Sequence, residues 1–263
     1  MEQLFYQREW QGIAFKELPG VDWSACAARG FYAAFYEQLL SRSFQPAPEW
    51  VESKRRIGAW LASTIRARAA RGVAPRILSV GAGLGIVERV LDEARYHVDV
   101  LECEPHSLKH LQSHLPGAGV ILGDARHIPC RTGSYDAVYM SNVDYCFDRS
   151  GYTQVWREMG RILRPGGLAV CVSSSNLSVR AVARGIRRRW LRRSVRGPSH
   201  LVWGYRRTVG EHVRAGRQAA LVCDAVYVFD HEFNPRAIRP AASVRLGWPT
   251  WADAEIAVVC VKR

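Results

Sequence analysis

The sequence predicts a doubly wound α/β fold with a mostly parallel sheet, and two observations support this prediction. Between Pro75 and Ser173, short apolar runs alternate with amphipathic stretches of helical period. Such alternation is typical of βαβ units, whose right-handed crossovers place helices on both faces of a parallel sheet. Near the end of the chain, residues 219–231 and 254–261 form two long apolar runs, which we expect to pair as antiparallel strands at the sheet edge.

The region before Pro75 is expected to be helical. Residues 23–43 and 49–71 carry apolar side chains at helical spacing, and a proline-containing break separates them. We therefore expect residues 1–74 to form a helical N-terminal cap over the carboxyl ends of the strands. Residues 75–263 would form the sheet domain, with an insertion at about residues 175–218.

Glycine and proline mark the boundaries of the elements in the sheet domain, because both residues interrupt regular structure. The segment Pro165–Gly167 ends the last of the expected helices and begins a turn. The expected strands are residues 76–80, 97–102, 119–122, 135–141 and 168–173, and the expected helices are residues 86–95, 105–114 and 152–163.

Composition excludes several classes of protein. The 263 residues are 48% hydrophobic and 23% charged, which is ordinary for a globular chain that builds its core without metal or disulfides. The seven cysteines are scattered without a CxxC pair, so we expect free thiols in a reducing cytoplasm and no metal site. No run reaches the roughly 18 apolar residues of a membrane span, and the first residues lack the apolar core of a secretory signal. The sequence makes no prediction of oligomeric state.

The formal net charge of +13 comes from an excess of arginine. Residues 184–217 contain eleven arginines and a single acid, Glu211, with tryptophan and tyrosine between them. This pattern fits a solvated helix of the expected insertion, but it also fits an anionic substrate, an anionic lipid surface or RNA. These alternatives stay open.

The most informative motif is ILSVGAGLG at residues 77–85, where a strand runs into alternating glycines and then into a helix. Glycine permits positive φ and leaves bare backbone against which a ligand can lie. The helix that follows offers unpaired N–H groups to an electron-rich ligand. A nicotinamide-binding fingerprint would need glycine where Ile86 stands, so a dehydrogenase is disfavoured. The expected cofactor-binding residues in this loop are Gly81, Ala82, Gly83 and Gly85.

Two acids follow the next two strands. Glu102 ends the second strand, where a carboxylate can accept hydrogen bonds from both hydroxyls of a ribose. Gly123-Asp124-Ala125 follows the third strand, where the Asp124 side chain and a backbone amide can contact the edge of an adenine ring. Carboxyl ends of parallel strands meet at one edge of a sheet, so these groups predict an adenosine site.

In order and spacing, these motifs and the Arg161–Gly167 turn resemble the class I S-adenosylmethionine-dependent methyltransferases, particularly the small-molecule group. The resemblance covers about residues 75–173 and the two-strand ending. It implies a seven-stranded sheet whose last strand is antiparallel, with S-adenosylmethionine as the cofactor. The resemblance also implies that the glycines pass beneath the methionine and ribose, that Glu102 binds the ribose, and that Asp124 and Ala125 contact the adenine.

The sequence departs from this family at Ser79, where many members carry an acid that helps hold the methionine amino group. Glu88, in the first turns of the next helix, is the candidate to replace that acid. The departure also leaves open a degenerate cofactor-binding protein without enzymatic activity.

Candidate catalytic residues follow the fourth strand, where the reacting atoms are expected. Asn142, Asp144 and Tyr145 belong to a segment that is not common in the family, although Asp144 could instead cap a helix and Tyr145 could belong to the core. His127 is the histidine best placed to act as a general base. Tyr32, Tyr36 and Tyr145 are candidates for cation–π contact with the sulfonium.

We therefore expect methyl transfer to a small molecule. One alternative is cyclisation, in which the substrate's own amine attacks the γ-carbon and yields azetidine-2-carboxylate and methylthioadenosine. Another is RNA methylation, which is less favoured because residues 142–145 lack the prolines of the N/D-P-P-Y/F motif of enzymes that methylate base amines.

Overall fold

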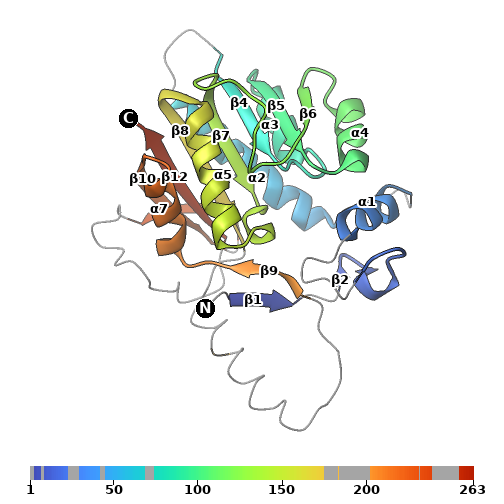
Figure 1. Ribbon diagram of the computed structural model, residues 1–263. Helices are drawn as coiled ribbons and strands as arrows, with labels where there is room; N and C mark the ends of the chain where they lie inside the picture. The colour runs from blue at the N-terminus through green and yellow to red at the C-terminus, as the bar shows by residue number, and fades with distance from the viewer. Residues whose placement is uncertain are drawn as a thin grey trace.

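The computed structural model describes residues 3–6, 9–22, 30–41, 45–68, 74–174, 183, 202–230, 232–238 and 255–263. Its centre is an eight-stranded sheet with the order β11-β10-β12-β8-β7-β4-β5-β6 (Figure 1). The inner strands are parallel, because β4 pairs in parallel with both β5 and β7, and β7 pairs in parallel with β8. The strands are β4 Arg76–Val80, β5 His97–Glu102, β6 Gly119–Leu122, β7 Tyr135–Ser141, β8 Leu163–Ser173, β10 Leu221–Phe229, β11 Pro235–Ile238 and β12 Ile256–Lys262.

Strand β12 is reversed relative to the inner strands of this sheet. It runs antiparallel to both β8 and β10, so β10 points in the same direction as the inner strands. The mostly parallel sheet and the antiparallel ending confirm the predicted fold class. The eighth strand, β11, was not expected: it adds a hairpin to the outer edge of β10.

Most strand boundaries were predicted correctly, because turn residues on both sides of a short apolar run leave little choice of where the strand begins and ends. The start of β8 was predicted wrongly, at residue 168 and not at Leu163. The turn through Gly166 stays extended in the structure, and Leu163 already pairs with Tyr135 before a bulge.

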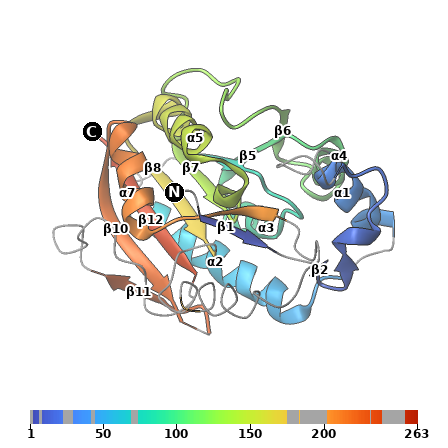
Figure 2. The same ribbon diagram turned by 60° about the horizontal axis from the view of Figure 1, so that its bottom comes forward.

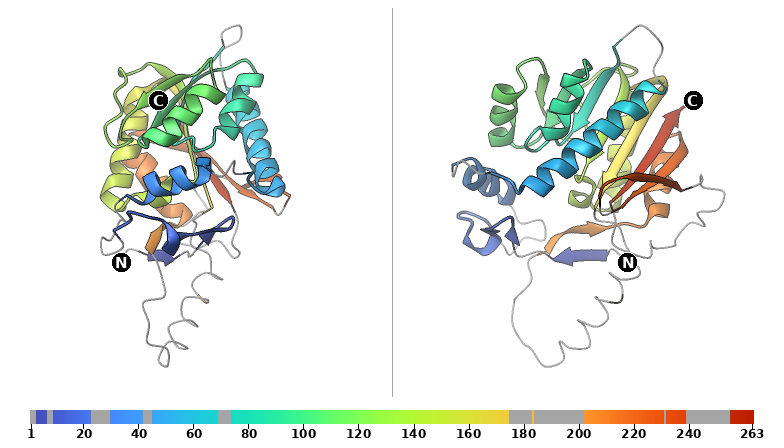
Figure 3. Two further views of the ribbon diagram at one scale, coloured as in Figure 1. Left: turned by 90° about the vertical axis from the view of Figure 1, so that its right-hand side faces the viewer. Right: turned by 180° about the vertical axis from the view of Figure 1, so that it is seen from behind.

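Helices cover both faces of the sheet (Figures 1 and 3). On one face α5 and α7 bury their apolar sides against β7, β8, β10 and β12, and on the other face α2, α3 and α4 do the same over β4, β5 and β7. This three-layer arrangement is what a doubly wound sheet requires. The helices are α2 Pro48–Arg66, α3 Ile86–Glu93, α4 Pro105–His114, α5 Arg149–Ile162 and α7 Val209–Gln218. None of the described helices combines the length and apolar character that a membrane span requires.

The second of the expected cap helices, α2, lies against the sheet and not over its edge (Figure 3). Its buried side chains Ile57, Leu61 and Ile65 belong to the core on that face. Near its end, the carbonyl of Ala62 accepts a hydrogen bond from the Tyr96 hydroxyl at 2.9 Å, just before β5 begins. The start of α2 therefore lies at the carboxyl edge of the sheet, beside the start of α3.

The rest of the N-terminal region covers the carboxyl edge and is not purely helical. Helix α1 (Phe31–Ser41) packs on the short helix η1 (Phe15–Glu17) through Phe15, Phe31 and Phe35. The hairpin of β2 (Glu9–Trp10) and β3 (Ile13–Ala14) was missed, because strands of two residues show no alternation.

One pairing joins two distant parts of the sequence. Strand β1 (Gln3–Tyr6) pairs antiparallel with β9 (Val202–Arg206), and the two-stranded sheet lies across the carboxyl edge (Figure 2). Residues 175–182 and 184–201 of the expected insertion, and with them most of its arginines, lie outside the described residues. The last expected part of the insertion, α7, is instead a helix of the sheet domain, since Val209 and Val213 are buried in its core.

We predict that Gly58→Ala lowers the free energy of unfolding by about 1–2 kcal/mol, although alanine favours helix by about 1 kcal/mol. A Cβ atom at Gly58 would lie 2.9 Å from the Cβ of Val90, so α2 and α3 would have to separate. Urea denaturation followed by circular dichroism measures the change. In a Val90→Ala background the same substitution should be neutral or stabilising, and a stabilising effect in the native background would contradict this packing.

Candidate active site

Strand register brings polar groups from three strands to one level at the carboxyl edge. Val80 pairs with Leu101 on one side and with Met140 on the other. The next residues along the three strands, Gly81, Glu102 and Ser141, therefore stand side by side. A cavity of about 690 Å³ opens above them.

Aromatic rings form much of the cavity wall. They come from the N-terminal elements, from the segment after β7 and from the segment between β10 and β11. Trp10 contacts Phe35 and Trp50 edge to face, with ring centroids 5.5 Å and 5.4 Å apart. Ligand sites are commonly apolar and aromatic with a few polar groups, and this cavity has that composition. The lining rings are Trp10, Tyr32, Phe35, Tyr36, Trp50, Tyr145, Phe147 and Phe233.

The glycine loop forms the floor of the cavity. Gly81 and Gly83 adopt φ values of 72° and 59°, which side chains disfavour. A Cβ atom at Gly81 would lie 2.6 Å from Val143, and one at Gly83 would lie 3.3 Å from the Tyr36 hydroxyl. Ala82 also lines the cavity. Gly85, at the start of α3, lies outside the cavity lining and packs against Leu111 of α4.

Glu102 joins the end of β5 to the glycine loop. One carboxylate oxygen accepts the N–H of Cys103 at 2.9 Å, and the other lies 3.5 Å from the N–H of Gly83. Burial raises the pKa of Glu102, and the Cys103 and Gly83 amides oppose that rise. This carboxylate is thus a hydrogen-bond acceptor held at the cavity wall.

Glu88 is almost fully buried, at 2% exposure, and also lines the cavity. One of its oxygens, Oε1, accepts hydrogen bonds from the Ser79 hydroxyl at 2.6 Å and the Tyr139 hydroxyl at 2.5 Å. The other, Oε2, is buried without a hydrogen-bond partner among the described residues, as is the hydroxyl of nearby Ser141. Burial raises the pKa of Glu88, and the two hydroxyl donors oppose that rise.

Asn142 braces the edge of the sheet above β7 and β8. Its φ of 57° is left-handed, its Nδ2 donates to Glu255 at 2.9 Å, and its Oδ1 accepts the N–H of Ser174 at 2.7 Å. Lys54 completes the group, since its Nζ lies 3.3 Å from the same Glu255 oxygen. Both polar ends of Asn142 are thus engaged by the protein itself.

Tyr145 lies in the cavity wall beside Tyr32 and Cys146. The Tyr32 hydroxyl and the Cys146 thiol are 2.9 Å apart. Removal from solvent raises the pKa of both tyrosine hydroxyls. These hydroxyls therefore stay protonated at neutral pH and can donate hydrogen bonds, but they are poor bases.

Asp144 does not line the cavity. It is 0% exposed, and one of its carboxylate oxygens accepts the Ser173 hydroxyl at 2.8 Å. Its backbone carbonyl accepts a hydrogen bond from Arg207, which also donates to the carbonyls of Phe147 and Asp148. Burial raises the pKa of Asp144 to about 6, although the Arg207 charge and the Ser173 hydroxyl oppose the rise. This position fits a fold-supporting role for Asp144 more closely than contact with a ligand.

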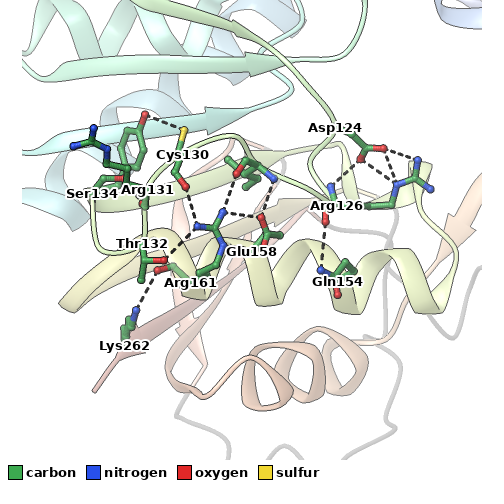
Figure 4. Close-up of polar contacts among 12 residues, drawn as sticks. Asp124, Arg126, Cys130, Arg131, Thr132, Ser134, Gln154, Glu158, Arg161 and Lys262 are labelled. Atoms are coloured by element: carbon green, nitrogen blue, oxygen red, sulfur yellow. Dashed lines mark hydrogen bonds and ion pairs between the residues drawn. The ribbon is translucent and has the colours of Figure 1, made fainter.

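The loop after β6 carries the other expected residues, and they lie outside the described cavity lining. Asp124 forms an ion pair with Arg126, with a closest N···O distance of 2.6 Å (Figure 4). Ala125 is buried in the core, and His127 is exposed. No histidine lines the cavity within the described ranges. Farther along this loop, the carbonyls of Ile128 and Cys130 accept hydrogen bonds from the Arg161 side chain of α5 (Figure 4).

Sequence reasoning missed many of the cavity residues, among them Lys54, Glu255 and Trp10. Lys54 and Glu255 are far apart in the chain, and neither lies in a recognisable motif. An unusual lysine on the apolar side of α2 was the one available signal for Lys54. Among the described residues, no cluster of His, Cys, Asp and Glu is arranged to hold a metal ion.

Comparison with known sequences agrees with this geometry. Residues 78–171, from β4 to β8, match a family model described as a methyltransferase domain. A protein of Mycobacterium ulcerans named a probable phthiotriol/phenolphthiotriol dimycocerosates methyltransferase is 34% identical over 98 residues, covering 35% of this chain and 36% of that protein. An uncharacterized methyltransferase of Mycobacterium tuberculosis is 34% identical over 94 residues, covering 36% and 37%. The chain thus spans little more than a third of the length of the curated relatives it matches.

Comparison with solved structures extends the likeness to the whole fold. A methyltransferase of Thermotoga maritima, described as S-adenosylmethionine-dependent, has a TM-score of 0.57 at 14% identity and covers 87% of this chain and 98% of its own. Another, from Methanosarcina mazei, has a TM-score of 0.56 at 15% identity and covers 76% and 96%. At these identities the likeness shows the fold.

We predict that Asp144 makes the stability of the protein depend on pH. The folded pKa of about 6 lies above the ordinary 3.8, so the fold favours the protonated acid. The stabilising contribution is complete below about pH 4 and is lost as pH rises through about 6, which amounts to roughly 3 kcal/mol at most. Denaturation midpoints of the native chain and of Asp144→Asn should be measured from pH 4 to 8. As pH rises, the stability advantage of the native chain over the variant should shrink, and it can reverse.

Asp148→Asn provides the matched control. The Gly151 N–H holds the pKa of Asp148 below its usual value, so its contribution is lost as pH falls. The two variants should thus differ in the sign of their pH dependence. A stability difference between the native chain and Asp144→Asn that does not change with pH would contradict the assignment.

Proposed function

We propose that this chain is a class I S-adenosylmethionine-dependent methyltransferase that transfers the methyl group of that cofactor to a small, largely apolar molecule. One observation carries the proposal: bare glycine backbone at Gly81–Gly83 lies beside the Glu102 carboxylate in the lining of an aromatic-walled cavity.

The residues present fit S-adenosylmethionine. Gly81 and Gly83 line the cavity with backbone that carries no side chain, so a ligand can lie close to that backbone. Glu102 stands where it can accept hydrogen bonds from the ribose hydroxyls, and the unpartnered Glu88 and Ser141 atoms offer further polar contacts. Contact of Asp124 and Ala125 with the adenine stays a prediction, since Asp124 would have to exchange or share its Arg126 partner.

When bound, the cofactor supplies an electrophilic methyl group on a positively charged sulfur. The protein has to align an acceptor atom with that methyl group and keep water out. Tyr32, Tyr36 and Tyr145 lie in the wall, where rings can stabilise a cation and hydroxyls can orient an acceptor. Asn142 would act as a positioning residue, because its amide already holds Glu255 and the backbone of Ser174.

The acceptor side of the cavity follows from the sheet order. With adenosine over β4 and β5, the acceptor lies over β7, β8 and the start of β12, next to Trp10, Trp50 and Phe233. Rings of this kind favour an apolar or aromatic acceptor over a highly charged one. The mycobacterial relative, whose name refers to dimycocerosates of phthiotriol, is consistent with an apolar acceptor.

The other reactions have less support. The comparisons give no support to cyclisation of the cofactor into azetidine-2-carboxylate, since the relatives are named methyltransferases. For RNA, the arginine-rich segment lies mostly outside the described residues, and no described feature favours it. An anionic acceptor would need a cation at the cavity, where Lys54 already pairs with Glu255 and Arg206 is the other cation in the described lining.

We predict that Glu102→Gln weakens binding of S-adenosylmethionine at least tenfold, because an uncharged amide accepts fewer and weaker hydrogen bonds than a carboxylate. Isothermal titration calorimetry measures the affinity. Asp92→Asn, which changes an exposed acid on α3, serves as the control and should bind normally. Wild-type affinity in Glu102→Gln would place the ribose elsewhere.

We also predict the nucleoside product. Incubation with S-adenosylmethionine and a panel of apolar phenols, alcohols and amines should give S-adenosylhomocysteine, detected by mass spectrometry, when an accepted molecule is present. Gly81→Ala should abolish turnover, because its Cβ atom would lie 2.6 Å from Val143 and narrow the floor of the cavity. Methylthioadenosine released without any acceptor would overturn methyl transfer as the function.

A further inference from the structure

An ion pair lies in the wall of the cavity on the acceptor side. The Lys54 ammonium and the Glu255 carboxylate are 3.3 Å apart, and their side chains are only 10% and 9% exposed. Both residues line the cavity, where aromatic rings form much of the remaining wall. A buried ion pair adds little to stability, because the loss of hydration offsets much of the attraction between the charges. Folding alone therefore does not explain why two charges stand here.

The pair has hydrogen-bonding capacity that the protein does not use. Oε1 of Glu255 accepts hydrogen bonds from Lys54 at 3.3 Å and from the Asn142 amide at 2.9 Å. The other oxygen, Oε2, has no hydrogen-bond partner in the described part of the chain, and it is not one of the unpartnered atoms that are sealed from solvent. Among the described residues the Lys54 ammonium donates only to Glu255, which leaves two of its N–H groups for a ligand. The pair thus offers a donor and an acceptor side by side.

Three elements hold this pair in position. Lys54 belongs to α2, and its Nζ lies 5.8 Å from the centroid of the Trp50 ring. Glu255 directly precedes β12, and Asn142 directly follows β7. Because two donors hold Oε1, the orientation of the carboxylate is fixed, and with it the direction in which Oε2 can accept a hydrogen bond.

We propose that Lys54 and Glu255 bind a hydroxyl group of the methyl acceptor: the Lys54 ammonium donates a hydrogen bond to the hydroxyl oxygen, and Oε2 of Glu255 accepts one from the hydroxyl. A hydroxyl is a neutral group that both accepts and donates hydrogen bonds. The pair carries no net charge, so a carboxylate would meet repulsion from Glu255 and an ammonium group would meet repulsion from Lys54. This inference rests on the proposed function, because it names the acceptor class of the same cavity: an apolar body that carries a neutral hydroxyl.

The test uses four probes that share one naphthalene skeleton: 2-naphthylmethanol, 2-naphthoate, 2-naphthylmethylamine and 2-methylnaphthalene. Their affinities are measured by NMR titration at neutral pH with S-adenosylhomocysteine present, which has no methyl group to transfer. The native chain should bind the alcohol at least about fivefold more tightly than the carboxylate or the ammonium probe. The hydrocarbon has no polar group, so its affinity reports whether the apolar wall is intact.

Two variants should shift the charge preference in opposite directions. Glu255→Gln leaves the Lys54 charge unpaired, so 2-naphthoate should gain at least about fivefold in affinity relative to 2-naphthylmethylamine. Lys54→Met leaves the Glu255 charge unpaired, so the same ratio should change by a similar factor in favour of the amine. Both variants should bind 2-methylnaphthalene with about the native affinity. Arg55→Met, at an exposed position next to Lys54 on α2, is the matched control and should leave all four affinities unchanged.

Three results would overturn the assignment. A native preference for 2-naphthoate would indicate recognition by Arg206, the other cation in the described lining. Equal losses for all four probes in both variants would show that the pair only supports the wall. If the native chain bound S-adenosylhomocysteine but none of the probes, the hydroxyl assignment would fail and the proposed function would stand. A chain that bound neither that nucleoside nor S-adenosylmethionine would remove the proposed function itself.

Discussion

The parallel pairing of β4 with β5 and β7 is the constraint on which the site depends. Parallel strands end at a common edge, and the register of this pairing sets the residues that follow each strand at one height. A slip of one residue would turn Leu78 and Val80 to the wrong face and remove Glu102 from the glycine loop. The apolar cores on both faces of the sheet therefore also fix the geometry of the polar residues above it.

Local sequence predicted the parts of the fold that local chemistry decides. Strands β4, β5, β6 and β7 were predicted with their boundaries, because each is an apolar run closed by glycine or polar residues. The positions of Gly81, Gly83, Glu88 and Glu102 around one cavity followed from the same logic. The roles of Asp124 and Asp144 were harder to predict. Arg126 pairs with Asp124 and Ser173 donates to Asp144, and these partners decide whether each carboxylate is available to a ligand.

Contacts between distant parts of the chain could not be predicted. Lys54 and Glu255 have no common motif, and their ion pair forms because α2 starts where the reversed strand β12 starts. The pairing of β1 with β9 likewise depends on where the chain returns after a long insertion. Periodicity describes one element at a time, so it says nothing about which two elements meet.

The reversed direction of β12 has a consequence for the order in which the molecule is completed. Because β12 runs against its neighbours, its first residues, and not its last, stand at the carboxyl edge, and Glu255 reaches Asn142 and Lys54 from there. A nascent chain that has released only the glycine loop and the central strands has the floor of the cavity but not this polar wall. The polar wall of the cavity is therefore complete only when β12 has taken its place beside β8.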